Sequence, residues 1–504
     1  MNIHSDLEKS ILLNLQKRRK HDDIDLHAET EAVLNDIGAS LSENEGNLTF
    51  YGKDPVIPSV LLFGSFSAIA LAAKASQIAS IWKMKTGESQ DIHIDVRKAL
   101  RRFATFYEGT LETVNGIPGN MNSETDSAVQ SGFYQCKDKK WVFITCTYPR
   151  LRNTALTLLQ CASDKKSVTK AISHWNGNDL EDAAGKAGIP LYVVRSPDEF
   201  LRLDVFQQVF NKEPLIKIEK VAESDPVPFI KGGEVLSGVK ALGLGHVIAG
   251  AAIGRALALH GADVLNIWLK DDYEHSLFHY TSNVGLRSAR MDLKNRPEER
   301  ARFDKLLSEA DVFFSNKRSG FLERYNLTPD ELARKHPGLI TATVYFNGEM
   351  GPWSERVGFD VSLGAYAGPY WLDSLGGTYK KVNEPHVTPD IGIICDYVSA
   401  WLTSVGVLEA LKRRAVSGGS YKVSVSLGRT VCWLLSLGIF DQQYACDTAD
   451  SDDEHAYVEP DPILADTPMG YYKGVAEQVD MSKTPGKYKY LLNPLFSSLP
   501  EWDN

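Results

Sequence analysis

Short apolar runs alternate with longer amphipathic stretches through the second half of the chain. The apolar runs predict strands over residues 239–244, 263–268, 310–315 and 339–346, and helices are expected between them. A regular alternation of strand and helix is typical of a parallel sheet covered by helices. We therefore expect an α/β pattern that continues to about residue 430.

The turn after the first of these strands is rich in glycine and opens an amphipathic helix. Such a turn places backbone N–H groups and a helix N-terminus where a phosphate can bind. Its glycines do not fit G-x-G-x-x-G, because Ile248 stands three residues after Gly245, and the second strand ends in Trp268 where a ribose-binding acid is wanted. The pattern indicates a nucleotide-type fold and argues against a nicotinamide-dependent oxidoreductase.

The first half of the chain is less regular. Polar helices are predicted over residues 1–50, an alanine-rich apolar helix over 58–81 and an alternating strand over 90–96. Residues 131–148 predict a hairpin, with helices to about residue 205. A proline-rich linker is expected around 221–238, and the acidic tail from 446 is expected to become loop-like. Because 504 residues exceed one compact core, we expect several units: 1–125, 126–225, 226–445 and 446–504.

Two segments that lie far apart in the sequence have the same predicted order of elements. Residues 79–96 and 408–427 both read as a helix, basic residues, a glycine break and an alternating strand. At the offset of 331 residues that aligns them, Ser65 falls opposite Asp396. Chance similarity and internal duplication both explain the match, and its extension through the preceding small-residue helix favours duplication.

The composition of the chain disfavours several kinds of partner and location. The net charge of −10 disfavours nucleic acid as a partner. The six cysteines are scattered without C-x-x-C spacing, which suits free thiols in a reducing compartment and indicates no metal site. The N-terminus lacks the apolar core of a secretory signal, and no apolar run is long enough to span a bilayer. We expect a cytoplasmic protein that does not act at a membrane.

Asp396 is the main candidate for covalent chemistry. It stands between an apolar strand-like run and a long apolar helix, so an ordinary N-cap would explain it. A carboxylate at a helix N-terminus is also held ionised by the helix dipole and can attack an activated acyl group. The adjacent backbone N–H groups could stabilise the oxyanion that forms.

Basic residues near predicted strands are the candidates for anion binding. Lys317, Arg318 and Arg324 follow the strand at 310–315, and Arg287 lies just before another predicted strand. Arginine grips phosphate with two hydrogen bonds at once, but a solvated loop is the alternative at each position. Gly348 lies in a segment, GEMGPW, with the composition of a turn.

Taken together, these motifs resemble the class III CoA-transferases, the CaiB/BaiF type that includes formyl-CoA transferase, carnitine CoA-transferase and α-methylacyl-CoA racemase. The resemblance rests on five segments that come in the family's order, over about residues 235–430: the glycine-rich turn with its helix, SARMDLKN, ADVFFSNKRSGFLERYNLTPDEL, HPGLITATVYFNGEMGPWSERVGFD, and Asp396 with its helix. It implies a Rossmann-like large domain with a smaller α+β domain, in an interlocked fold that here carries an internal partial duplication.

The resemblance also implies a mechanism. Asp396 matches the aspartate that attacks acyl-CoA to give an aspartyl–acyl anhydride and then an aspartyl-CoA thioester. An acceptor carboxylic acid then takes the CoA, and no metal or redox cofactor is involved. The residues expected to contact CoA are His246, Val247, Ile248 and Ala249 near the thioester, Arg324 near the phosphates, and Arg318, Arg287 and Gly348.

The chain departs from the family pattern at several positions. Phe359 replaces a histidine that a racemase needs for proton transfer, which disfavours that activity. Ile248 and Gly364 replace glutamines, and Ser65 replaces aspartate in the first repeat. A non-catalytic CoA-binding or scaffold protein is therefore the alternative from a different class. The duplicated plan is compatible with a homodimer and with a pseudo-dimeric monomer.

Overall fold

A seven-stranded sheet forms the centre of the molecule. The computed structural model describes residues 7–120 and 131–503. The strands lie in the order β11-β10-β9-β12-β13-β14-β8, and all are parallel to their neighbours except β8, which is antiparallel to β14. Their bounds are β8 Lys217–Ala222, β9 Lys240–Leu244, β10 Asp263–Leu269, β11 Arg287–Met291, β12 Val312–Ser315, β13 Ile340–Tyr345 and β14 Ser420–Ser426.

The strand order reverses between β9 and β12, as in a Rossmann-like sheet. At such a reversal the loops that leave the carboxyl ends of the two strands diverge and open a crevice for ligands. The four strands expected in this region are confirmed to within two residues at each end. The sheet therefore places the glycine-rich turn after β9 beside the segment after β12.

Two further strands differ from expectation. Arg287 lies within β11, not before a strand, and β8 partly occupies the expected linker. Both are edge strands of the sheet. Their sequences, RSARM and KIEKVA, carry charged residues and therefore lack a clear apolar signal.

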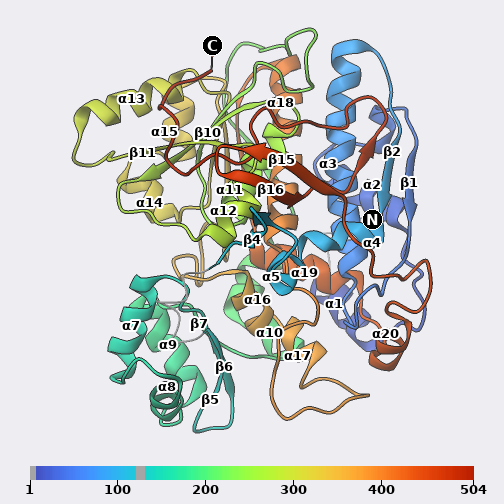
Figure 1. Cartoon of the computed structure of the whole chain (residues 1–504), viewed down its shortest axis with the longest axis vertical. Coiled ribbons are helices and arrows are strands. Elements are labelled where there is room, and N and C mark those ends of the chain that lie inside the picture. Colours follow the sequence, from blue (N-terminus) through green and yellow to red (C-terminus); the bar gives the residue numbers. More distant parts are fainter. Residues whose placement is uncertain (1–6, 121–130, 504) are drawn as a thin grey trace.

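Helices cover both faces of the sheet (Figure 1). On one face lie α11 (Ala249–Ala258) and α18 (Asp396–Ser417), which pack against each other. On the other face, α13 (Pro297–Ser308), α14 (Ser319–Arg324) and α15 (Pro329–Lys335) contribute leucine and phenylalanine side chains to a second core. The other helices near this unit are α12 Ser276–Ser282, α16 Asp360–Tyr366, α17 Pro369–Asp373, α19 Leu427–Leu437 and α20 Gln442–Thr448.

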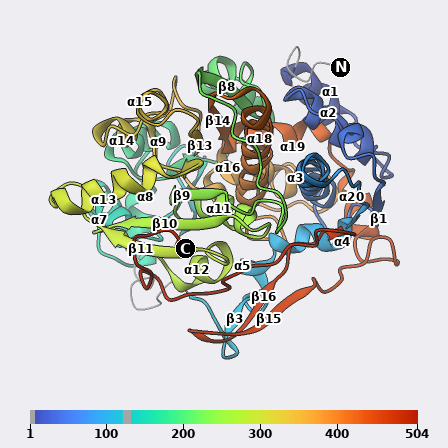
Figure 2. The same cartoon turned by 90° about the horizontal axis from the view of Figure 1, so that it is seen from above.

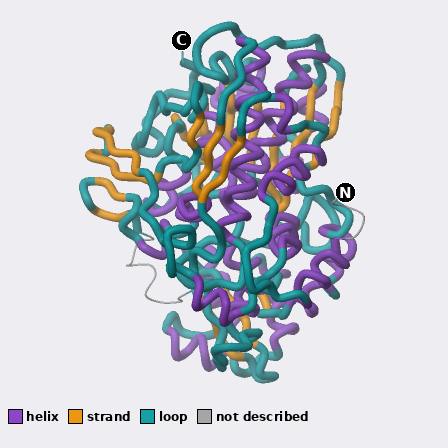
Figure 3. The backbone as a smooth tube through the Cα atoms, turned by 90° about the vertical axis from the view of Figure 1, so that its right-hand side faces the viewer, coloured by secondary structure: helices purple, strands orange, loops and turns teal. Residues whose placement is uncertain are grey.

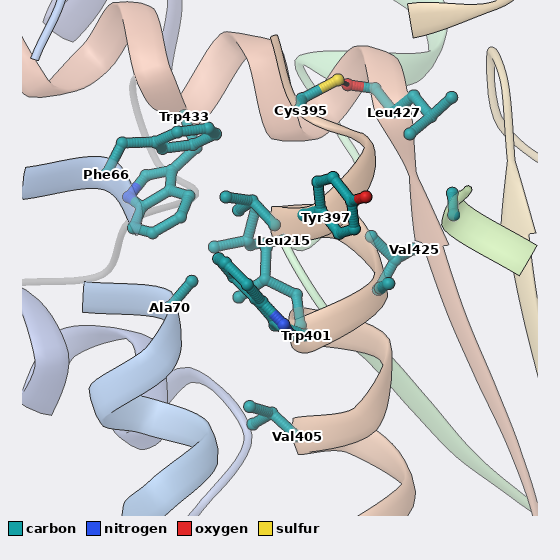
Figure 4. Close-up of a cluster of buried hydrophobic side chains, with 14 of the residues drawn as sticks. Phe66, Ala70, Leu215, Cys395, Tyr397, Trp401, Val405, Val425, Leu427 and Trp433 are labelled. Carbon is teal, nitrogen blue, oxygen red and sulfur yellow. Dashed lines mark hydrogen bonds between the residues drawn. The ribbon is translucent and has the colours of Figure 1, made fainter. Parts of the chain in front are cut away.

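The long helix α3 (Phe63–Thr86) packs along α18. Figure 4 shows Phe66 and Ala70 of α3 facing Trp401 of α18, with Trp433 of α19 beside Phe66. The rings of Phe66 and Trp433 are 5.0 Å apart. Burial of this aromatic and aliphatic contact fixes the N-terminal segment against the amino-terminal half of α18.

The same succession of elements occurs twice at an offset of 331 residues. The helices α3 and α18 end at Thr86 and Ser417, the strands β2 (Ile92–Asp95) and β14 end at Asp95 and Ser426, and the next helices, α4 (Val96–Ala99) and α19, begin at Val96 and Leu427. Asp95 and Ser426 each cap the helix that follows. This correspondence agrees with the expected repeat, and its origin by duplication stays a prediction.

Residues from 132 to 193 form a small unit, at the lower left of Figure 1. The expected hairpin is confirmed as β5 (Gly132–Gln135) and β6 (Trp141–Ile144), which β7 (Leu191–Val193) extends to a three-stranded antiparallel sheet. With α7 (Pro149–Leu159), α8 (Lys165–Ile172) and α9 (Gly177–Ala187) it encloses its own core. The expected boundary at 125/126 lies outside the described residues. A short helix, α10 (Pro197–Leu201), and a π-helix, η3 (Phe206–Phe210), lead on to β8.

The C-terminal tail returns to the N-terminal segment. It forms a β-hairpin where a loop was expected, β15 (Pro462–Thr467) with β16 (Gly470–Val475). β16 pairs with β3 (Thr113–Val114), which in turn pairs with β4 (Ile117–Pro118). The four-stranded sheet projects from the body in Figures 2 and 3. The strand β17 (Asp480–Met481) pairs with β2, which also pairs with β1 (Leu48–Tyr51).

The remaining elements are α1 Leu7–Gln16, α2 Leu26–Asp36, η1 Leu41–Glu43, η2 Leu100–Arg102 and α5 Thr105–Glu108. The polar helices expected before residue 50 correspond to α1 and α2. Among the helices of the described residues, none has the length and apolar character needed to cross a bilayer.

Candidate functional site

The turn between β9 and α11 is held by side-chain amides from the two neighbouring strands. Asn266 of β10 accepts the Gly245 N–H at 2.9 Å and donates to the Gly245 carbonyl, while Asn316 makes the same pair of bonds with His246 after β12. A Cβ on Gly245 would lie 2.5 Å from the Gly250 carbonyl carbon, so only glycine allows this close turn. The turn is fixed at the sheet's point of reversal.

Val247 occupies a strained conformation in this turn. Its φ is +56°, which costs a β-branched residue on the order of 1–3 kcal/mol. The Val247 N–H donates to Glu274 Oε2 at 2.9 Å, and the Ser282 hydroxyl donates to the Val247 carbonyl. Ile248 and Ala249 follow as the N-cap and the first residue of α11, so the whole segment expected near a thioester forms one constrained loop.

A polar contact with Asp272 and an aromatic contact with Trp268 fix the His246 side chain. Its Nε2 is 2.8 Å from Asp272 Oδ2, and its ring centroid lies 4.3 Å from that of the fully buried Trp268. Burial lowers the pKa of His246 to about 4, so the imidazole is neutral near pH 7. Burial raises the pKa of Asp272, but the bond from His246 and the charge of Lys317 outweigh it and lower that pKa to about 2.

Two buried carboxylates meet at the amino end of α18. The Asp360 carboxylate accepts the backbone N–H groups of Ile394, Cys395 and Asp396 at 2.6, 2.6 and 2.8 Å. The side chain of Asp396 is 7% exposed, and among the described residues no group hydrogen-bonds to its carboxylate. Cys395 is the N-cap and Asp396 the first helical residue, so the N-cap interpretation of Asp396 is wrong.

Charge and burial act together on this pair. Burial raises the pKa of Asp396 well above its usual range, and the nearby negative charge of Asp360 raises it further. Burial also raises the pKa of Asp360, but three N–H donors favour its ionised form. Asp396 is therefore a carboxyl group to which no residue of the described ranges hydrogen-bonds, and it holds its proton more tightly than an exposed aspartate.

Aromatic rings connect this pair to the small unit. Phe359, the N-cap of α16, stacks on Tyr148 with centroids 6.0 Å apart and planes at 11°. Tyr148 is the N-cap of α7, and its ring centroid lies 5.1 Å from that of His275. Phe359 thus occupies the position of the racemase histidine with a ring that serves packing.

A cavity of about 410 Å³ opens between the small unit and the carboxyl edge of the sheet. Four of its lining residues are cations, and none of the described lining residues is acidic. The Arg356 Nη2 pairs with Asp182 at 2.8 Å, while its buried Nη1 has no hydrogen-bond partner in the described part of the chain. The lining residues are Arg150, Leu151, Thr154, Ala187, Gly188, Asn316, Lys317, Arg318, Tyr345, Phe346, Ser354, Arg356, Val357, Gly358 and Phe359. The cavity is suited to an anionic ligand, and its wall reaches the residue before Asp360.

The structure brings only some of the expected anion-binding residues to this cavity. Arg318 lines it, with Nη1 bonded to the Glu355 carbonyl at 2.8 Å. Arg324 is exposed at the end of α14, with its guanidinium 5.9 Å from the Phe321 ring centroid, and it does not line the cavity.

Arg287 and Gly348 lie elsewhere. Arg287 starts β11 at the amino edge of the sheet, where its guanidinium bonds to Asp263 and to the Glu501 carbonyl. Gly348 has φ +100°, and a Cβ there would lie 2.6 Å from Val209 of η3. Both residues have a structural explanation within the fold.

Gly364 also has a structural reason. A Cβ at this position in α16 would lie 2.3 Å from the Tyr370 ring, so a glutamine does not fit beside that tyrosine. The sequence pattern did not single out Arg150, Arg356, Asn316, Tyr148 or Glu274. The RVGFD segment pointed to the region of Arg356, but no local signal marks contacts between segments that are separated in the sequence, such as Asn316 with His246 or Tyr148 with Glu274.

Part of the chain is similar to known proteins. Residues 236–473 match the model of CoA-transferase family III. Over 214 residues the chain is 32% identical to an acetyl-coenzyme A transferase, nodX, from Hypoxylon pulicicidum, with 41% of this chain and 35% of the relative covered. Over 228 residues it is 28% identical to an (R)-2-hydroxy-4-methylpentanoate CoA-transferase from Clostridioides difficile, with 42% and 55% covered.

The matches span about a third to just over half of the length of these relatives. Among solved structures, a CAIB/BAIF family protein from Brucella suis is 25% identical over 40% of this chain and 55% of its own, with a TM-score of 0.34. A hypothetical protein from Mycobacterium tuberculosis is 25% identical over 40% and 57%, with a TM-score of 0.36. The matched segment of this chain contains β9 to β14, the constrained turn and both buried carboxylates. Residues 236–473, just under half of the chain, therefore form a segment of CoA-transferase family III, and a CaiB/BaiF CoA-transferase family protein from Caenorhabditis elegans is among the relatives that it matches.

Proposed function

We propose that the protein is a CoA-transferase that moves CoA from an acyl-CoA to a free carboxylic acid, with Asp396 as the nucleophile. The observation that carries the proposal is the buried Asp396 carboxyl group, which no described group hydrogen-bonds, at the first position of α18. Relatives that match this segment are named as CoA-transferases with different acids, which supports the reaction class and leaves the acids open.

The proposed reaction proceeds by acyl transfer through Asp396. Its carboxylate attacks the thioester carbonyl, the C–S bond breaks, and an aspartyl–acyl anhydride and CoA thiolate form. The thiolate attacks the aspartyl carbonyl, giving an aspartyl-CoA thioester and the donor carboxylate. The acceptor carboxylate attacks this thioester to form a new anhydride, and the thiolate then attacks the acceptor carbonyl and restores Asp396. No step changes an oxidation state.

We place the anionic part of CoA in the cavity beside the small unit. Arg150, Lys317, Arg318 and Arg356 provide the positive charge there, and Arg356 Nη1 lacks a partner. The thioester then points along Phe359 toward Asp396, with the loop from His246 to Ala249 on its other side. Arg324 is exposed at the end of α14 and does not line the cavity, so we expect it only to add positive charge near the cavity.

The substitution Asp396→Asn tests the nucleophile. An amide cannot form the anhydride, so we expect turnover to fall by at least 1,000-fold while CoA still binds. Asp373→Asn is the matched control, because Asp373 is equally buried (7% exposed) and accepts hydrogen bonds from Ser59 and Val60 outside the proposed site. Its turnover is expected to stay within threefold of the wild type. Full activity of Asp396→Asn would overturn the assignment, and binding of CoA by an inactive wild type would favour the scaffold alternative.

A further inference from the structure

The geometry points to Glu274 as a positioning residue that ties the constrained loop at Val247 to Tyr148 of the small unit. This inference rests on the proposed function for its consequence in catalysis, but the tie itself can be tested without activity. Glu274 lies between β10 and α12, and its side chain is buried. Neither the sequence pattern nor the resemblance to the family marks it.

Three donors from separate parts of the site converge on the Glu274 carboxylate. Oε1 accepts the Tyr148 hydroxyl at 2.7 Å and the His275 N–H at 3.1 Å, and Oε2 accepts the Val247 N–H at 2.9 Å. Tyr148 belongs to the small unit, Val247 to the turn after β9. A single carboxylate therefore joins two segments that are 99 positions apart in the sequence.

The contact at Val247 supports a backbone that would otherwise relax. Val247 has a positive φ, and its N–H points into the protein and not into the i→i−4 pattern of a helix. Without an acceptor at Oε2, the buried N–H would lack a partner and the strained turn would lose one of its fixed points. The loop from His246 to Ala249 is the one we place beside the thioester, so its position affects the reacting atoms.

The contact at Tyr148 extends the tie toward Asp396. The Tyr148 ring stacks on Phe359, and Phe359 precedes Asp360, which binds the backbone N–H of Asp396. The Tyr148 hydroxyl points to Glu274, which sets the ring's orientation. Glu274 thus acts on both sides of the thioester position: on the loop through Val247, and on the nucleophile's support through Tyr148 and Phe359.

An ionised carboxylate accepts at both oxygens and donates at neither. Burial raises the pKa of Glu274 to about 7, so this form predominates above that pH. In Glu274→Gln the side chain has the same shape, but its NH₂ group faces a backbone N–H on either side, that of Val247 or that of His275, so one of these two bonds is lost. Glu31→Gln is a matched control. Glu31 accepts the Ser40 hydroxyl at 3.0 Å and the Leu41 N–H at 2.8 Å, in the N-terminal segment.

The experiment combines hydrogen exchange with steady-state kinetics on the full-length protein. In Glu274→Gln we expect amide exchange in the peptide that covers residues 246–250 to accelerate at least tenfold, while Glu31→Gln leaves it unchanged. We expect kcat to fall at least tenfold and KM for the acyl-CoA to stay within threefold, because the cationic cavity is intact. Tyr148→Phe removes only the hydrogen bond from the Tyr148 hydroxyl to Glu274. We expect kcat to fall less, and exchange at residues 246–250 to accelerate less, than in Glu274→Gln.

The outcomes separate the two proposals. Unchanged exchange at 246–250 in Glu274→Gln would overturn the positioning role, whatever the activity. Faster exchange in a protein whose wild type has no transferase activity would retain the tie and count against the proposed function alone. If Glu274→Gln does not fold, Tyr148→Phe decides: wild-type kcat and wild-type exchange in that variant would contradict the inference.

Discussion

At the scale of single residues, the proposed chemistry depends on how two buried carboxyl groups share charge. Asp360 is held by three backbone N–H groups, whereas Asp396 has no protein hydrogen bond to its carboxylate among the described residues. A like charge nearby disfavours ionisation, so Asp360 and burial both keep Asp396 protonated to higher pH. The attacking species is the carboxylate, and its formation should therefore limit the reaction in acid.

The first prediction concerns pH. Because the pKa of Asp396 is raised, kcat/KM should fall as pH decreases through that pKa, well above the usual range of an aspartate. Asp360→Asn removes the neighbouring charge and should move this acidic limb to lower pH by about one unit. The pH dependence of kcat/KM in both proteins measures the shift. An acidic limb that stays in place, or moves upward, would contradict the assigned coupling.

The same raised pKa has a defined effect on stability. A carboxyl group whose pKa is higher in the folded than in the unfolded state binds its proton more tightly when folded. Its contribution to the free energy of unfolding is therefore largest below the unfolded pKa and decreases as pH rises through the folded pKa. Ionised Asp396 therefore lowers the stability of the folded protein above that pKa, at a site that we propose is catalytic.

At the scale of elements, close packing explains one departure from the family pattern. Gly364 in α16 leaves room for the Tyr370 ring of α17. We expect Gly364→Ala to lower the free energy of unfolding by about 1–3 kcal/mol, because the added methyl group overlaps a buried ring. Gly132→Ala is the control, since a Cβ there meets nothing within 4 Å. Chemical denaturation of both variants measures the difference, and equal stability would show that Tyr370 moves aside without cost.

Elements with strong local signals could be predicted from the sequence. The strands β9, β10, β12 and β13, the hairpin β5–β6 and the long helices α3 and α18 have apolar patterns that do not depend on distant partners. The strand β8 could not be predicted, because its sequence becomes a strand only at the edge of a sheet that other segments build. A strand was expected directly after Arg287, but β11 begins at that residue. The hairpin of the tail was also missed, although β15 and β16 are neighbours in the sequence. Its further pairing joins Tyr472 to Val114, about 360 positions away, and no local pattern marks that contact.

The residues of the candidate site can also be sorted by whether the sequence marks them. Asp396, the loop from His246 to Ala249, and Arg318 could be selected from the sequence, because they lie in or next to contiguous motifs. Asn316, Glu274 and Tyr148 could not, because their roles arise from contacts across the fold. Arg287 is the opposite case, a residue that the sequence suggested but that has a structural role. Its guanidinium already bonds to Asp263 and to the Glu501 carbonyl of the tail.

At the scale of the whole molecule, α3 and α18 pack side by side as counterparts in the two repeats (Figure 1). The amino end of α3 has Ser65 where α18 has Asp396, and Asp54 accepts the Gly64 and Ser65 N–H groups much as Asp360 does at α18. Ser65 Oγ is buried without a hydrogen-bond partner in the described part of the chain. Serine cannot form the aspartyl anhydride, so we expect one reactive position in each chain.

Intact mass spectrometry after incubation with a panel of acyl-CoAs tests this account most directly. We expect one acyl or CoA adduct per chain, which maps to Asp396 and is lost on treatment with hydroxylamine. We expect no adduct on the peptide that contains Ser65. An adduct at another residue, or none with any donor from a protein that binds CoA tightly, would contradict the claim that Asp396 carries CoA transfer.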